Sequence, residues 1–119
     1  MTQLEISEIV QSQRKFFRTN ATLPVNFRID ALRKLHNAIK SNEEKIAKAI
    51  KSDLGKSAME SYMCETGLTL SEISYMIKHL KRFACEKRVR TPLPQYLSHK
   101  KKKPSPYGVT LIMSPWNYP

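Results

Sequence analysis

Apolar residues recur at helical spacing through the first third of the chain. From Leu4 to Phe17 they stand mostly three or four positions apart, which is typical of an amphipathic helix. The residues of 19–24 favour turns, and Pro24 cannot continue a helix. A second helical pattern starts near Val25, and its apolar side carries Phe27, Ala31, Leu32, Leu35, Ala38 and Ile39. We therefore predict two helices separated by a short turn.

The next helix boundary is predicted at Ser41. Ser41-Asn-Glu-Glu44 has the spacing of a capping box, in which the serine hydroxyl accepts from the Glu44 amide. A new helix then carries Ile46, Ala49, Ile50 and Leu54. Gly55 is a typical C-terminal stop.

A longer helix is predicted from Ala58 or Met59 to about Glu86. Gly67 inside it costs about 1 kcal/mol relative to alanine and is expected to mark a close helix contact. Residues 90–95 contain two prolines and are predicted to form an extended loop. The apolar face of the helix consists of Tyr62, Leu68, Ile73, Met76, Ile77, Leu80 and Phe83.

The pattern changes from helix to strand beyond Gln95. Residues 96–103 end in four lysines, which suit an edge strand, and a proline-rich turn follows. Residues 109–113 are almost continuously apolar, as in a strand buried on both faces of a parallel sheet. A parallel partner needs a crossover of a dozen or more residues, and only six follow. We therefore expect the chain to be part of a larger domain.

Composition narrows the function classes. The chain has 119 residues, 26% of them charged, and no apolar run long enough to cross a bilayer. Its first residues include acids and lack the apolar stretch of a signal peptide. Cys64 and Cys85 cannot form a disulfide framework, so we expect buried free thiols in a reducing cytosol. The predicted location is cytoplasmic.

The net charge of +11 is concentrated late in the chain. Lys78–Lys103 contains ten basic residues and a single acid, Glu86. Such a stretch attracts nucleic acid, an anionic membrane or a phosphorylated ligand. The alternative, which we favour, is a solvated helix face followed by a charged edge strand.

Few residues offer catalytic or metal chemistry before the last segment. His36, His79 and His99 lack metal-ligand spacing with either cysteine, and we predict no metal site. Neither cysteine has a nearby histidine that would indicate a reactive thiolate. Residues 53–57 resemble a phosphate loop only superficially, because they contain one glycine and follow a helix.

Ser114-Pro-Trp-Asn-Tyr-Pro119 directly follows the predicted buried strand. In open α/β sheets, ligands bind beyond the carboxyl ends of the strands. The Asn117 amide donates hydrogen bonds regardless of pH, so it is suited to stabilise an oxyanion. The alternative is an ordinary loop with packed aromatic residues.

Pro106-Tyr-Gly-Val-Thr-Leu-Ile-Met-Ser-Pro-Trp-Asn-Tyr-Pro119 resembles the P-x-G-V-x-x-x-I-x-P-W-N-[FY]-P segment of the aldehyde dehydrogenase superfamily. Three further stretches resemble its class 3 branch: Phe27-Arg-Ile29, Asp53-Leu-Gly-Lys56 and Glu72-Ile-Ser-Tyr-Met-Ile77. The resemblance runs from about residue 5 to residue 119.

The resemblance implies NAD- or NADP-dependent oxidation of an aldehyde to a carboxylic acid through a cysteine thiohemiacetal. It assigns oxyanion stabilisation to Asn117 and places 62–68 near the substrate entrance. A homodimer is expected for the complete enzyme, with no nucleic acid partner and no membrane contact by this segment. The residues that it places along the cofactor cleft are Ile112, Met113, Ser114, Pro115 and Trp116.

The implied fold is α/β with a Rossmann-like cofactor domain, of which this segment is the mainly helical part with a β-hairpin-like end. We expect a helical segment over 1–95, a strand of the oligomerisation sheet and a turn over 96–105, and the first strand and motif loop of an incomplete NAD(P)-binding domain over 106–119.

The family's nucleophilic cysteine and general-base glutamate lie beyond this motif, and Cys64 and Cys85 precede it. We therefore expect the chain alone to be inactive, because partial catalytic sets retain little activity. We also expect poor solubility, because a buried strand without neighbours leaves backbone groups unpaired. The alternative function is a small basic helical module that binds nucleic acid or an anionic membrane through 78–103.

Overall fold

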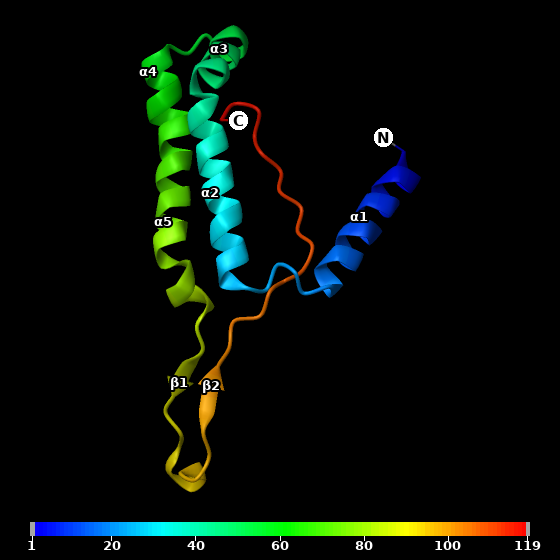
Figure 1. Cartoon of the computed structure of the whole chain (residues 1–119), viewed down its shortest axis with the longest axis vertical. Helices are drawn as coiled ribbons and strands as arrows, with labels where there is room; N and C mark the ends of the chain where they lie inside the picture. Colours follow the sequence, from blue (N-terminus) through cyan, green and yellow to red (C-terminus); the bar gives the residue numbers. More distant parts are fainter. Residues whose placement is uncertain (1, 119) are drawn as a thin grey trace.

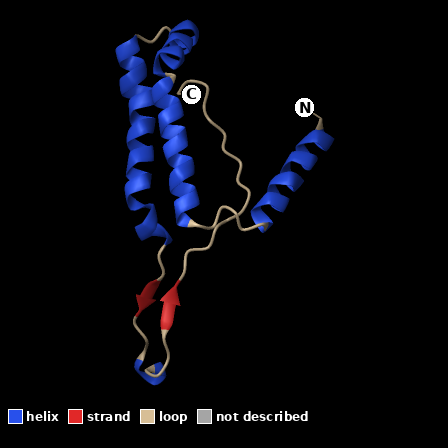
Figure 2. Ribbon diagram, in the orientation of Figure 1, coloured by secondary structure: helices blue, strands red, loops and turns tan. Residues whose placement is uncertain are grey.

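Helices dominate the computed structural model, which describes residues 2–118 (Figure 1, Figure 2). The helical elements are α1 (Gln3–Arg18), α2 (Val25–Ser41), α3 (Glu43–Leu54), α4 (Ala58–Ser61), the π-helix η1 (Tyr62–Thr66) and α5 (Gly67–Ala84). They are followed by β1 (Lys87–Val89), the 3-10 turn η2 (Leu93–Gln95) and β2 (Lys100–Lys102). The mainly helical character with a terminal hairpin is as predicted.

The core lies between α2, α3 and α5. Helices α2 and α5 run side by side, and α3 and α4 cap one end of the pair (Figure 1). The buried apolar side chains are Ile29 from α2, Ile50 from α3, and Ile73 and Leu80 from α5. Ile50, Ile73 and Leu80 lie on the predicted apolar faces, whereas Ile29 was not among the residues predicted for the apolar side of α2.

The chain is far more extended than a closed domain of its size. Its radius of gyration is 20.0 Å, whereas a compact chain of this length has about 13.5 Å. Helix α1 stands apart from the α2–α5 pair and has no buried residue (Figure 1). Much apolar surface is therefore left uncovered, including Leu4 and Phe16 on α1.

The boundary between α2 and α3 lies where the sequence places it, but the predicted capping box is wrong. Ser41 is the last residue of α2, and Asn42 is the N-cap of α3 without a side-chain cap bond. The Asn42 side-chain amide instead donates to the Ala38 carbonyl at 2.8 Å. Because one residue joins the two helices, Ser41 keeps helical geometry and cannot cap.

The long helix predicted from 58 to about 86 begins at Ala58 and is interrupted by a π turn at η1. The Gly67 N–H donates to the Tyr62 carbonyl, five residues earlier. A Cβ at Gly67 would lie 2.6 Å from that carbonyl oxygen. The close contact predicted at Gly67 is therefore real, but it lies within its own helix and not between helices.

The hairpin of β1 and β2 begins ahead of the predicted strand over 96–103, and β2 covers only part of that range. The two strands pair antiparallel, with Arg88 opposite Lys101. Residues 96–99 are not strand, and β1 was not predicted because three residues, two of them basic, give no alternating pattern.

Residues 109–113 were predicted to be a strand, but they form no ladder in the structure. The segment runs past α1 and alongside α2 without a neighbouring strand (Figure 2). Leu111 and Ile112 are 84% and 87% exposed. Without a partner the backbone cannot complete a sheet, so the segment stays irregular. The predicted division into 1–95, 96–105 and 106–119 remains a prediction.

Among residues 2–118 no helix combines the length and the apolar character needed to span a membrane.

Candidate functional site

The last described residues, 114–118, return to the junction between α3 and α4. The chain leaves the hairpin, passes between α1 and α2, and ends near the end of α2 that is far from the hairpin (Figure 1). Trp116 and Asn117 form a turn there. The Asn117 segment therefore lies beside the α3–α4 junction.

Gly55 shapes the junction. It adopts the left-handed conformation with φ of 70°, and its N–H donates to the Lys51 carbonyl at 3.0 Å. Glycine favours this conformation because it has no Cβ, and it ends α3 as the sequence predicts. Lys56 follows directly, at the start of the connection to α4.

The Lys56 ammonium group contacts the Glu65 carboxylate, the Asn117 backbone carbonyl and the Tyr118 ring. Its Nζ lies 2.5 Å from the Glu65 Oε1 of η1. It also donates to the backbone carbonyl of Asn117 at 3.4 Å. The same nitrogen lies 4.3 Å from the centroid of the Tyr118 ring, within cation–π range. One side chain thus connects the α3–α4 junction, η1 and the end of the chain.

The ion pair is partly sheltered from solvent. The side chains of Lys56 and Glu65 are 20% and 9% exposed, so water screens their attraction less than at an open surface. The hydrogen bond to Glu65 raises the pKa of Lys56 above its usual value. The ion pair therefore favours the charged form of the ammonium group.

Asn117 is exposed, and its backbone carbonyl and side-chain amide differ in their hydrogen bonding. The backbone carbonyl accepts from Lys56, whereas the side-chain amide forms no hydrogen bond with any residue of 2–118. The amide therefore keeps both N–H donors available for a ligand.

The five residues predicted to line a cofactor cleft form an open strip that leads to Asn117. Ile112 and Met113 are 87% and 83% exposed, and Ser114 and Pro115 are also exposed. Trp116 borders a cavity of about 580 Å³, whose other walls are α2, α3 and the η1–α5 helix. The strip resembles one wall of a cleft.

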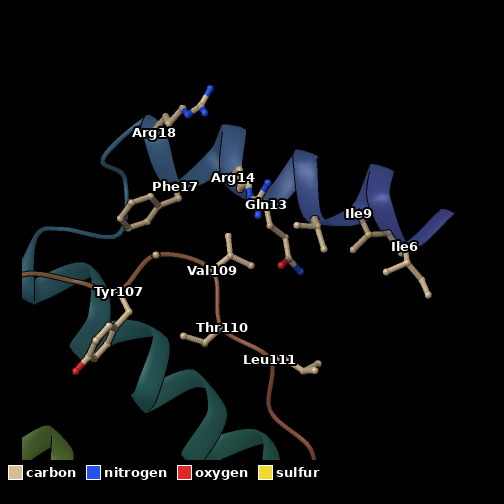
Figure 3. A pocket seen from close by; sticks show the side chains of 12 residues that line it. Ile6, Ile9, Gln13, Arg14, Phe17, Arg18, Tyr107, Val109, Thr110 and Leu111 are labelled. Carbon is tan, nitrogen blue, oxygen red and sulfur yellow. The ribbon is translucent and has the colours of Figure 1, made fainter. Parts of the chain in front are cut away.

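A second cavity, of about 700 Å³, lies between α1 and 107–111 (Figure 3). Ile6, Ile9 and Phe17 line its α1 side, and Val109 points toward them (Figure 3). Its lining includes none of 112–118, so it is separate from the predicted site.

The histidines and cysteines form no site in the described part of the chain. No group of three potential metal ligands occurs within residues 2–118. His79 stacks on Tyr75, with ring centroids 4.4 Å apart. Cys64 and Cys85 are free but exposed, which corrects the prediction that they are buried. Cys64 lies in η1, and Cys85 is the C-cap of α5.

Sequence reasoning missed Lys56 and Glu65 as parts of this site. Asp53-Leu-Gly-Lys56 was considered only as a phosphate loop and as a family signature. The contact of Lys56 with Asn117 spans 61 residues, so no local pattern could reveal it.

Comparison with known proteins decides the family. The chain matches the aldehyde dehydrogenase family over residues 1–119. The chain belongs to the aldehyde dehydrogenase family. A solved structure, the substrate-bound state of Staphylococcus aureus AldH, superposes with a TM-score of 0.91 at 39% identity. That comparison covers 100% of this aldehyde dehydrogenase chain and 26% of the staphylococcal one.

Curated relatives agree with the predicted class 3 branch. The 4,4'-diaponeurosporen-aldehyde dehydrogenase of Staphylococcus aureus is 40% identical over 96% of this chain. The dimeric NADP-preferring aldehyde dehydrogenase of Canis lupus familiaris is 39% identical over 97%. Aldehyde dehydrogenase family 3 member A2 of Rattus norvegicus is 34% identical over 92%. The chain spans about a quarter of the length of these relatives, 25%, 25% and 23% respectively.

Proposed function

We propose that this chain is the N-terminal part of an NAD(P)-dependent aldehyde dehydrogenase and that the Asn117 amide stabilises the oxyanion formed from the aldehyde. The observation that carries the proposal is the Pro115-Trp-Asn-Tyr118 turn, whose Asn117 amide is exposed and unengaged while its backbone is tied to Lys56.

The proposed role of Asn117 follows from the chemistry of its side chain. When a nucleophile adds to an aldehyde, negative charge develops on the carbonyl oxygen. A neutral amide donor can meet that charge without changing its own protonation state. Losing one such donor costs about 2.7–4 kcal/mol of transition-state stabilisation, or about 100- to 1000-fold in kcat.

The cofactor implied by the family, NAD or NADP, accepts hydride from the substrate when it is bound. Residues 112–116 fit one wall of its cleft, because Ile112, Met113 and Trp116 offer exposed apolar surface beside an extended backbone. They contribute no cationic group for the diphosphate. We assign them contact with the cofactor and no proton transfer.

The chain alone is proposed to be inactive. The family's nucleophile and general base follow the P-W-N motif, whereas Cys64 and Cys85 precede it. The remaining oxyanion donor has no covalent intermediate to stabilise, and catalytic groups that act as a unit fail together.

A chimaera tests the proposal. Residues 1–119 would replace the matching quarter of the staphylococcal AldH, and reduced nicotinamide would be followed with an aliphatic and an aromatic aldehyde. The chimaera should be active, Asn117→Ala should lower kcat about 100- to 1000-fold, and the 119-residue chain alone should produce nothing. An Asn117→Ala chimaera with unchanged kcat would refute the oxyanion role, and Asn37→Ala on α2 is the matched control.

The native size of the protein tests the partial-chain proposal separately. An antibody against residues 60–90 should detect a species several times heavier than 13.8 kDa in the source cells. A single species of 13.8 kDa would contradict it.

The substrate is proposed to be an aldehyde, and the complete enzyme a homodimer. The support for dimerisation is that the canine relative is named dimeric. A cytoplasmic location is supported by the two free cysteines, which fit a reducing compartment.

The hairpin supports a second candidate function, binding of a polyanion through residues 78–103. Its strands place lysine and arginine side chains in exposed, directly opposed positions. Affinity for nucleic acid or anionic vesicles would then fall steeply with salt. Absence of binding at 50 mM salt would eliminate this candidate function. Polyanion binding also does not account for the P-W-N motif.

A further inference from the structure

We propose that Lys56, held by Glu65, is a positioning residue that fixes the Asn117 turn for oxyanion stabilisation. The inference rests on the proposed function, because it concerns the same asparagine. Lys56 would act through the backbone of the turn and would not touch the substrate.

The first argument is the geometry at the ammonium group. Lys56 Nζ reaches the Asn117 carbonyl at 3.4 Å and the Tyr118 ring at 4.3 Å from its centroid. These contacts hold both the peptide group and the residue that follows the asparagine. A Lys56 ammonium fixed in place therefore restricts the backbone from which the Asn117 amide projects.

The second argument is that Lys56 is itself fixed. Lys56 follows the left-handed Gly55 that ends α3, and the ammonium group at the end of its side chain is held by the Glu65 carboxylate. Glu65 comes from η1, whose π turn is preceded by the capped start of α4. A lysine side chain on an open surface samples many rotamers, so the ion pair with Glu65 is what gives Lys56 a defined position.

The third argument is that the apolar side chains ahead of Asn117 are open to solvent. Trp116 is 86% exposed, and Met113 ahead of it is 83% exposed. The cavity beside α1 is lined by residues up to Leu111 and by none of 112–118. Lys56 thus provides the polar contacts that join Asn117 and Tyr118 to the α3–α4 junction.

We call the contacts of Lys56 with Glu65, Asn117 and Tyr118 the anchor. The fluorescence of Trp116 tests whether the anchor holds the turn in the 119-residue chain. Trp116 is the single tryptophan, so its time-resolved anisotropy reports the mobility of the turn directly. Lys56→Met keeps the length of the side chain and removes its charge. We expect faster and wider motion of Trp116 in Lys56→Met and Glu65→Gln, and intermediate motion in Lys56→Arg, which keeps the pair with Glu65.

The matched control is Lys51→Met. Lys51 is an exposed lysine in the last turn of α3, and no side-chain contact joins it to the turn among residues 2–118. It should leave the Trp116 anisotropy unchanged. Equal anisotropy in Lys56→Met and Lys51→Met would overturn the anchor. Measurements at low concentration, with circular dichroism as a check on helix content, separate release of the turn from unfolding.

Kinetics of the chimaera test whether the anchor contributes to catalysis. Lys56→Met should lower kcat by about tenfold with little change in KM for the aldehyde, because misplacing a transition-state donor raises the barrier without weakening ground-state binding. Lys56→Arg should recover part of the loss. A loss confined to KM, or no loss at all, would overturn the positioning role.

The outcomes distinguish the two proposals. If Asn117→Ala leaves kcat unchanged or the chimaera is inactive, the proposed function fails, and the anisotropy alone decides whether Lys56 anchors the turn. If Asn117→Ala lowers kcat while Lys56→Met behaves like Lys51→Met, only the Lys56 inference fails.

Discussion

Lys87 of β1 lies directly opposite Lys102 of β2 in the antiparallel pair. Like charges in directly opposed positions destabilise a strand pair. Glu86 offsets part of the repulsion, since its carboxylate accepts from Lys101 at 3.1 Å and lies 3.7 Å from Lys103 Nζ. The hairpin is therefore a balance between two opposing electrostatic effects, and both can be tested.

Salt should stabilise the hairpin. Raising the ionic strength from about 0.01 M to 0.15 M shortens the Debye length from about 30 Å to 8 Å and screens the lysine repulsion. The Glu86 contacts, at 3.1 and 3.7 Å, lie well within the Debye length and are screened less. Amide hydrogen exchange of Val89 and Lys100 should consequently slow as salt rises. Faster exchange at high salt would mean that the Glu86 pairs dominate.

Acid should open the same hairpin. The hydrogen bond from Lys101 lowers the pKa of Glu86, with Lys103 adding to the effect. A carboxyl group whose pKa is lower in the folded state stabilises that state above its unfolded pKa, and the contribution is lost as pH falls through the folded pKa. Protection of the Val89 amide should fall below about pH 4.5 and not at neutral pH.

The matched pair for this prediction is Glu86→Gln and Glu72→Gln. Glu72 is an exposed acid on α5 outside the hairpin. Glu86→Gln should abolish the acid-dependent change in hairpin protection, whereas Glu72→Gln should retain it. If both variants keep the change, a different group is titrating.

Local sequence patterns predicted most of the helical body but little of its long-range organisation. Spacing placed the helices, and Gly55 correctly marked the end of α3. The cap at Ser41 failed because a one-residue connection leaves no room for a capping serine. The strand over 109–113 failed because β-propensity describes how a segment packs, and nothing in residues 2–118 pairs with it.

The sequence likewise predicted some residues of the candidate site and missed others. Asn117 and the strip before it were found from a motif, since its residue types are specific and contiguous. Lys56 and Glu65 were missed, because an ion pair and a carbonyl contact across 61 residues depend on how α3, η1 and the chain end meet. Such contacts follow from tertiary structure and leave no periodic signal.

The start of α4 should depend on Ser57. Its hydroxyl accepts from the Glu60 N–H at 3.2 Å, and Glu60 accepts from the Ser57 N–H at 2.8 Å. Replacing an N-cap serine with alanine costs about 1 kcal/mol, which corresponds to about fivefold faster amide exchange in α4. Ser71→Ala, at an exposed mid-helix position of α5, should not accelerate exchange. Equal rates in the two variants would contradict the capping role.

Two glycines should resist alanine for different reasons. Gly67→Ala would gain about 1 kcal/mol of helix propensity, but its Cβ would lie 2.6 Å from the Tyr62 carbonyl oxygen. Overpacked sites lose about 1–3 kcal/mol, so we expect a net loss of up to about 2 kcal/mol. Gly55→Ala has open space and should lose about 1–2 kcal/mol through its left-handed backbone. Urea unfolding followed by circular dichroism measures both, and stabilisation by Gly67→Ala would show that the π turn relaxes without cost.

Self-association of the chain should be caused by residues 109–113. Leu111 and Met113 are 84% and 83% exposed beside a backbone that has no strand partner, and such segments pair with other copies. Leu111→Lys with Met113→Lys should shift the sedimenting mass toward 13.8 kDa. The control adds the same charge at Leu4 and Met59, which are 72% and 67% exposed on helices. If the control disperses the chain equally well, net charge and not the unpaired segment governs solubility; if it does not, association occurs through the strip that leads to Asn117.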